Sequence, residues 1–83
     1  MPAQTPIRRL REPDDFIVDE IKGALQRCET IHQVNATAVQ YKRDVMALAN
    51  SQSRHNRTMA IQIKNLADYR RKMIAADQER EIR

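Results

Sequence analysis

The sequence predicts an all-α protein: a long amphipathic helical region preceded by an extended N-terminal arm. Three observations favour this fold class. No glycine or proline follows Gly23, and these are the residues that most disfavour a helix interior. Acidic residues concentrate in positions 14–20 and arginines occupy positions 80 and 83, which is the charge distribution that a helix dipole favours. Apolar residues also recur in alternating steps of three and four, as in coiled coils and helical bundles.

The first 13 residues differ from the rest of the chain. Pro2, Pro6 and Pro13 are spaced through them, and each proline disfavours helix at the residue before it. We therefore expect an extended arm at 1–13, which is either a frayed terminus or a segment that docks on a neighbour. A helical interaction domain then spans 14–83, and Pro13 suits the start of its first helix because its missing N–H costs nothing there.

One apolar seam follows most of the helical region. Alternating steps of three and four from Ile31 to Ala76 reach fourteen positions, of which eleven are apolar, whereas a chain that is 41% hydrophobic would place about six there by chance. The residues before Ile31 keep this spacing but are offset by one extra step of three, which locally overwinds a supercoil or marks a change of partner. We expect a helix-packing interface formed by Ile17, Ile21, Cys28, Ile31, Val34, Ala38, Tyr41, Val45, Leu48, Met59, Leu66, Tyr69 and Met73.

Residues 50–57 are ambiguous. They are mediocre helix formers, and their number suits a connection between two helices. The seam nevertheless keeps its phase across them, and they include no glycine or proline. The sequence therefore predicts a long helix that is continuous or hinged near 50–57, or else a two-helix hairpin of 14–49 and 58–82. The preserved phase favours the long helix.

Three polar residues interrupt the seam: Gln52, His55 and Gln62. If they are buried between helices, they would fix the register and the oligomer number at a cost in stability. Alternatively, the seam is open there and these side chains are in water at a hairpin bend. A buried His55 in a symmetric assembly would also loosen the contact when it is protonated at low pH.

Basic side chains form two clusters, one in the arm (Arg8, Arg9 and Arg11) and one in the last third of the chain (Arg70, Arg71 and Lys72). They could contact an anionic partner, either nucleic acid or an acidic protein, or they could be a solvated helix surface. The formal net charge is only +4, and no aromatic residue lies among the arm arginines to stack on a base. Nucleic-acid binding is therefore an alternative that we do not favour.

The sequence contains no motif for catalysis or for an intrachain metal site. It has no glycine-rich phosphate loop, nucleophile elbow or HExxH segment. Cys28 and His32 are four residues apart and could bind zinc only together with the same pair from a second copy. A small buried thiol beside a partly exposed histidine is the simpler interpretation, so we predict no metal site. Because the catalytic and cofactor-binding motifs are missing, we also predict no enzyme and no cofactor.

The size and composition of the chain favour association. A chain of 83 residues with 4% aromatic residues builds only a modest core, so we expect a homo-oligomer or a subunit of a larger assembly. No segment approaches the roughly 18 apolar residues of a membrane span, and we expect a location inside the cell or in a particle assembled there. The leading hypothesis is a structural or assembly subunit. The alternatives are a small basic nucleic-acid regulator and a helical inhibitor or adaptor of one protein target.

Overall fold

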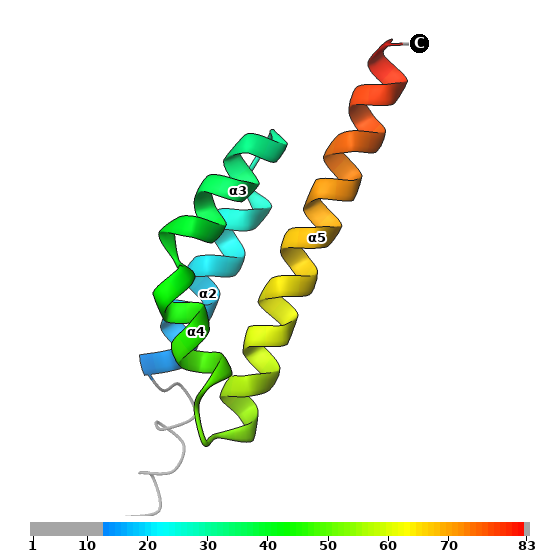
Figure 1. Cartoon of the computed structure of the whole chain (residues 1–83). Coiled ribbons are helices and arrows are strands. Elements are labelled where there is room, and N and C mark those ends of the chain that lie inside the picture. Colours follow the sequence, from blue (N-terminus) through cyan, green and yellow to red (C-terminus); the bar gives the residue numbers. More distant parts are fainter. Residues whose placement is uncertain (1–12, 83) are drawn as a thin grey trace, which may run out of the picture.

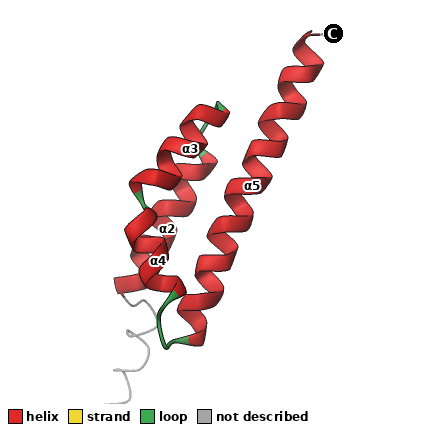
Figure 2. Ribbon diagram, viewed as in Figure 1, coloured by secondary structure: helices red, strands yellow, loops and turns green. Residues whose placement is uncertain are grey.

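Four helices make up most of the part of the chain that the structure describes. The computed structural model describes the backbone of residues 13–82 and the side chains of residues 15–80. The helices are α2 (Pro13–Gln26), α3 (Ile31–Gln40), α4 (Lys42–Ala49) and α5 (Arg54–Ile82). The chain runs along α2, returns through α3 and α4, and reverses again into α5 (Figure 1). The all-α fold class is therefore confirmed (Figure 2), whereas the predicted arm with Arg8, Arg9 and Arg11 lies outside the described residues.

The turn between α2 and α3 is fixed by a capping box. The Thr30 hydroxyl accepts a hydrogen bond from the Gln33 N–H at 3.0 Å, and the Gln33 side-chain oxygen accepts one from the Thr30 N–H at 3.3 Å. The same oxygen accepts the Glu29 N–H at 2.6 Å. These bonds satisfy backbone donors that the first turn of a helix leaves unpaired. The helical region before residue 50 is therefore folded in two at residues 27–30.

Tyr41 separates α3 from α4 without redirecting the chain. Its backbone has φ −102° and ψ 14°, and hydrogen bonds of helical type continue across it: the Tyr41 N–H donates to the Thr37 carbonyl, and the Val45 N–H donates to the Tyr41 carbonyl. The Tyr41 hydroxyl donates to the Glu20 carboxylate at 2.8 Å. This bond links the middle of α3–α4 to α2.

The chain reverses direction at residues 50–53 (Figure 1), so the favoured prediction of one long helix, continuous or hinged near 50–57, is wrong. The turn uses serine hydroxyls in place of glycine or proline. The Ser53 hydroxyl accepts the Asn56 N–H at 3.2 Å and so caps the start of α5, while the Ser51 hydroxyl accepts the Ser53 N–H at 3.0 Å. Arg57 also donates to the Ser51 carbonyl at 2.8 Å. The alternative prediction, a two-helix hairpin, placed the chain reversal in the correct region. It treated residues 14–49 as one helix, whereas the structure divides them into α2, α3 and α4.

The core lies where α5 meets the other three helices. Helix α5 contacts each of α2, α3 and α4, and side chains from all four helices fill one interior. Ile21, Leu25 and Val34 are the largest fully buried side chains. The buried apolar residues, including these three, are Val18, Ile21, Leu25, Cys28, Val34, Leu48, Ala60, Ile63, Ala67 and Ile74.

In α5 the buried stripe is displaced by one residue from the predicted seam. Tyr69 and Met73, both expected in the seam, are 56% and 38% exposed. The cause is the turn at 50–53, because a loop does not carry the 3.6-residue period of one helix into the next. Each apolar residue that α5 buries lies one position after a predicted seam position: Ala60, Ile63, Ala67 and Ile74.

Candidate interaction groove

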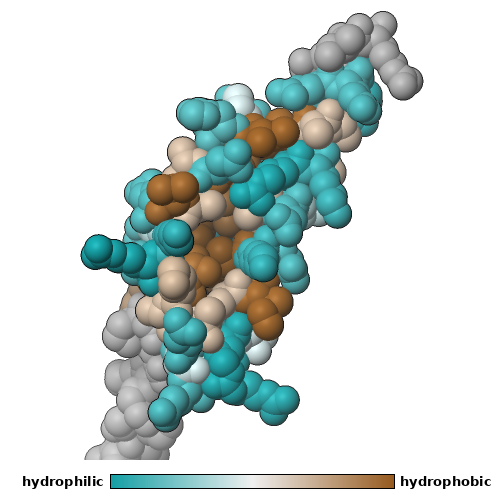
Figure 3. Space-filling model, viewed as in Figure 1, coloured by the Kyte–Doolittle hydropathy of each residue, from teal (hydrophilic) through white to brown (hydrophobic). Residues whose placement is uncertain are grey.

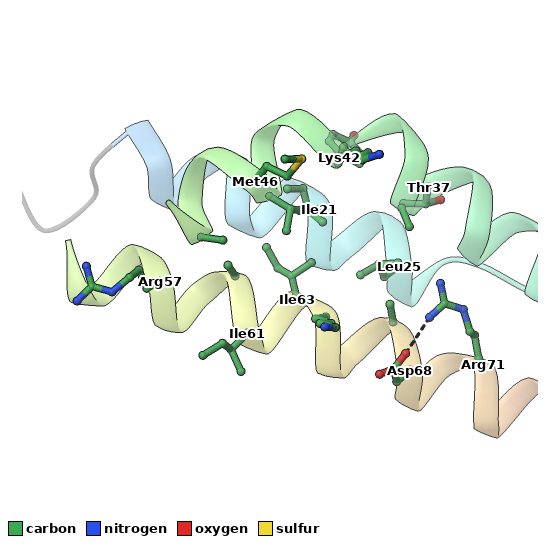
Figure 4. A pocket seen from close by; sticks show the side chains of 17 residues that line it. Ile21, Leu25, Thr37, Lys42, Met46, Arg57, Ile61, Ile63, Asp68 and Arg71 are labelled. Atoms are coloured by element: carbon green, nitrogen blue, oxygen red, sulfur yellow. Dashed lines mark hydrogen bonds and ion pairs between the residues drawn. The ribbon is translucent and has the colours of Figure 1, made fainter. Parts of the chain in front are cut away.

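An apolar groove of about 650 Å³ opens between α3–α4 and α5. Ile21 and Leu25 of α2 lie at its floor, as Figure 4 shows between the two walls. Both walls carry alanines, which are Ala38 and Ala49 on α3–α4 and Ala60 and Ala67 on α5. A methyl side chain leaves space that a leucine or isoleucine at the same position would fill. The alanines of the two walls therefore contribute to the volume of the groove.

Exposed apolar side chains extend the groove to the surface. Met46 of α4 and Ile61 of α5 belong to its lining and are 51% and 60% exposed. On this face of the molecule, apolar surface gathers in a central hollow with polar side chains around it (Figure 3). Contiguous apolar surface of this kind, bordered by polar residues, commonly marks an interaction site.

The charged residues of the lining are mostly basic. Lys42, Arg57, Lys64 and Arg71 are positive and Asp68 is negative, so four cations less one anion leave a net charge of +3. Arg71 contacts the Asp68 carboxylate at 2.8 Å and donates to the Asn35 side-chain oxygen at 2.9 Å. Figure 4 shows the contact between Arg71 and Asp68 beside the groove.

Lys42 and Lys64 are the two lysines of the lining, one on each wall. Within the part of the chain that the structure describes, neither ammonium group makes a hydrogen bond or an ion pair. Both side chains are exposed. Their charges are therefore available to a partner that enters the groove.

The residues predicted as the helix-packing interface fall into three groups by burial. Most of them contribute to the internal core of this chain, and some of these also line the groove. Ile21, Cys28, Val34 and Leu48 are buried, Ile17, Ile31, Tyr41, Val45, Met59 and Leu66 pack partly buried against them, and Ala38, Tyr69 and Met73 are exposed.

The three polar seam residues are all exposed. His55 contacts the Asp15 carboxylate at 3.0 Å, and Gln62 accepts a hydrogen bond from the Lys22 ammonium group at 2.9 Å. These bonds join the surface of α5 to that of α2, while Gln52 lies in the turn before α5. Their placement matches the solvated alternative and not a buried position within this chain.

The cluster at 70–72 is partly used inside the protein. Arg70 donates to the Cys28 carbonyl at 2.6 Å, which places a positive charge beyond the C-terminal end of α2, where the helix dipole favours it. The Arg70 Nε is buried and has no hydrogen-bond partner among the described residues. Since Arg71 is held by Asp68 and Asn35, Lys72 alone of the three makes no hydrogen bond or ion pair within the described chain. The cluster therefore offers fewer free donor groups to an anionic partner, and the Asp68 carboxylate offsets the charge of Arg71.

Cys28 and His32 do not form a site within the chain. The Cys28 thiol is buried and donates to the Ala24 carbonyl at 3.2 Å, with the Thr37 hydroxyl at 3.5 Å, whereas His32 is exposed. Among the described residues, no three His, Cys, Asp or Glu side chains are grouped so that they could hold a metal ion.

The hydrogen bond between Tyr41 and Glu20 affects an ionisation at the edge of the groove. Tyr41 belongs to the groove lining. The bond to the Glu20 carboxylate raises the pKa of Tyr41 above its usual 10.0, because it stabilises the protonated phenol, and desolvation and the charge of Glu20 act in the same direction. Tyr41 therefore keeps its proton to a higher pH than an isolated tyrosine.

No known protein family, curated protein or solved structure matches this chain. Across the described residues, no helix combines the length and the apolar character that crossing a membrane requires.

Proposed function

We propose that this protein is a non-enzymatic assembly subunit that acts by helix–helix association, and that the groove accepts a helix of another polypeptide chain. The observation that carries the proposal is an apolar groove at which Met46 and Ile61 expose large apolar side chains, above a floor formed by the buried Ile21 and Leu25. Helical bundles close such a surface by packing a further helix over it. Binding of an amphipathic helix in an apolar groove is also a recurring mode of protein recognition.

The dimensions of the groove suit a helix. On α5 its lining extends from Arg57 to Arg71, which corresponds to about 21 Å at 1.5 Å per residue. A partner helix of about four turns would match that length. Its apolar side chains would enter the space above the wall alanines, and its backbone would need no polar partners from the groove because a helix interior satisfies its own backbone hydrogen bonds.

The apolar groove also supports an assembly role on energetic grounds. Met46 and Ile61 expose large apolar side chains beside the groove, and removing apolar surface from water favours association. A partner that covers them would also stabilise the folded chain by mass action. Concentration-dependent thermal stability is thus an expected property of the protein in the presence of its partner.

The proposal is tested by measuring the mass of the full chain in solution over a range of concentrations, alone and with helical peptides. The peptides share one leucine stripe and differ only in flanking residues, which are glutamate, glutamine or lysine. We expect association with a peptide or with a second copy, and we expect Met46→Glu to abolish it. Val39→Glu is the matched control, because Val39 is 73% exposed and lies outside the groove lining. A chain that stays monomeric and binds none of the peptides would refute the proposal, as would equal losses in the two variants.

A further inference from the structure

We infer that the helix received by the groove is an acidic amphipathic helix of a different protein. This inference rests on the proposed function, and it adds the chemistry of the partner. The charged residues of the lining sum to +3, from four cations less one anion. Charged residues that flank an apolar stripe determine which helix pairs with which, and charge complementarity at the edge of an interface gives specificity and a faster encounter.

The basic groups are arranged on both walls. Lys42 is at the start of α4 and Lys64 is on α5, so a helix lying between the walls would have one lysine beside each flank. Carboxylates on both sides of the apolar stripe of the partner would therefore each find a cation. A helix with a single acidic flank would use only one of the two lysines.

The remaining lining charges do not cancel this preference. Asp68 is the one acidic residue of the lining, and its carboxylate contacts Arg71. Arg57 donates a hydrogen bond to the Ser51 carbonyl. This hydrogen bond orients the guanidinium group but does not neutralise its charge. An approaching carboxylate thus meets an excess of positive charge along the groove.

A second copy of this chain is a poorer occupant. The exposed apolar pair on α5, Tyr69 and Met73, lies within residues 65–76, whose only acidic residue is Asp68, and Lys72 adds positive charge there. Placing that surface in the groove would bring like charges together. Helix α2 is acidic, but Phe16 is its only large apolar residue that is exposed among the described positions, so it presents no apolar stripe. The arginine-containing sequence of residues 1–12 has the same sign as the groove.

The test compares affinities of the glutamate-, glutamine- and lysine-flanked peptides for the full chain, measured by fluorescence anisotropy at low and high salt. We expect the glutamate-flanked peptide to bind most tightly and to weaken as salt rises. The double variant Lys42→Glu/Lys64→Glu should lose about ten-fold in affinity for that peptide, since two exposed ion pairs become two repulsions. It should gain affinity for the lysine-flanked peptide.

The matched control is Arg43→Glu/Lys72→Glu. It changes the net charge by the same amount and alters one residue each of α4 and α5, but both residues are exposed and lie outside the groove lining. We expect it to leave the ranking of the peptides and their affinities within about two-fold of those of the unaltered chain, because the changed charges lie outside the groove. Far-ultraviolet circular dichroism of both variants checks that the helices are retained.

The results separate the inference from the proposed function. Equal binding of all three peptides, lost in Met46→Glu, would overturn the acidic partner and retain a helix-binding groove. Self-association that is lost in Met46→Glu, without peptide binding, would make a second copy the occupant and overturn the inference. If the two double variants lose equal affinity for the glutamate-flanked peptide, the preference for that peptide comes from the overall charge of the protein. That result would also overturn the inference. A monomer that binds nothing would overturn both.

Discussion

Replacing Ile63 by alanine should destabilise the protein strongly, whereas the same change at Ile61 should not. The two isoleucines lie two positions apart in α5, and they are 4% and 60% exposed. Both substitutions exchange isoleucine for the better helix former, so helix propensity changes equally in each. The comparison therefore isolates burial, and it tests which residues of α5 face the core.

The magnitude can be worked out from the atoms removed. Ile63→Ala deletes three carbons from a buried side chain, which at about 0.8 kcal/mol per buried CH₂ corresponds to about 2.4 kcal/mol. The additional cost of a cavity should be small, because Ile63 lines the groove and the vacated space joins it. We therefore expect a loss of about 2–3 kcal/mol, toward the lower end of such substitutions. For Ile61→Ala we expect a change within about 0.5 kcal/mol.

Urea unfolding followed by far-ultraviolet circular dichroism measures both changes in the free energy of unfolding. In thermal unfolding, the Ile63→Ala variant should melt about 10–20 °C below the unaltered chain. Equal losses in the two variants, or a larger loss for Ile61→Ala, would refute the placement of the buried stripe. Equal losses would instead favour the phase that the uninterrupted seam predicts, because that seam passes through Gln62, between the two isoleucines.

Two further predictions concern α2 and its contact with α3–α4. Gly23→Ala should raise the free energy of unfolding by about 0.5–1 kcal/mol in the same urea assay, because alanine favours a helix interior. The added Cβ would meet only the end of the flexible Arg27 side chain, at 3.2 Å. A destabilised variant would indicate a close backbone approach at Gly23. The pKa of Tyr41 is raised in the folded chain. The stability that Tyr41 contributes is therefore present below its unfolded pKa and is lost as pH rises through its higher folded pKa. Tyrosinate absorbance of a Tyr69→Phe variant should therefore show Tyr41 ionising above pH 10.0, and adding Glu20→Gln should lower that midpoint; an unchanged midpoint would contradict the role of the carboxylate.

The helical content was predictable from local sequence, and so was the start of α2. The absence of glycine and proline after Gly23 gives every later segment a helical preference, and Pro13 is the first residue of α2. The two reversals were harder to predict because neither uses a glycine with positive φ; the described residues contain none. The signals present were a threonine three residues before a glutamine, Thr30 and Gln33, and the serines at 51 and 53, whose hydroxyls bond to backbone N–H groups at the start of α5 and in the turn before it.

The displaced stripe of α5 shows why periodicity alone was insufficient. A count in steps of three and four treats a loop as if it were helix. The pattern therefore keeps its phase across residues 50–53 in the sequence, although the folded chain does not keep it there. Helix α5 contains two adjacent apolar stripes, one through Met59 and Leu66 and the other through Ile63 and Ile74. Only contact with three neighbouring helices determines which stripe is buried.

The groove could not be predicted from sequence. Its floor and walls come from all four helices, and its existence depends on which alanines come to line the space between the helices after folding. Lys42 and Lys64 are 22 positions apart in the sequence, and no local sequence pattern connects them. By contrast, the basic cluster at 70–72 was visible in the sequence, but the folded chain directs Arg70 and Arg71 to partners of its own.

The contact of α5 with every other helix has a consequence for how the protein is made. Translation delivers α2, α3 and α4 before α5, and until then Ile21 and Leu25 lack the helix that covers much of the interior. The nascent chain therefore exposes apolar surface throughout that interval, the condition in which chains aggregate or engage chaperones. Any pause of the ribosome within the codons for residues 54–74 would prolong it. The moment at which α5 leaves the ribosome sets the earliest time at which this chain can become native.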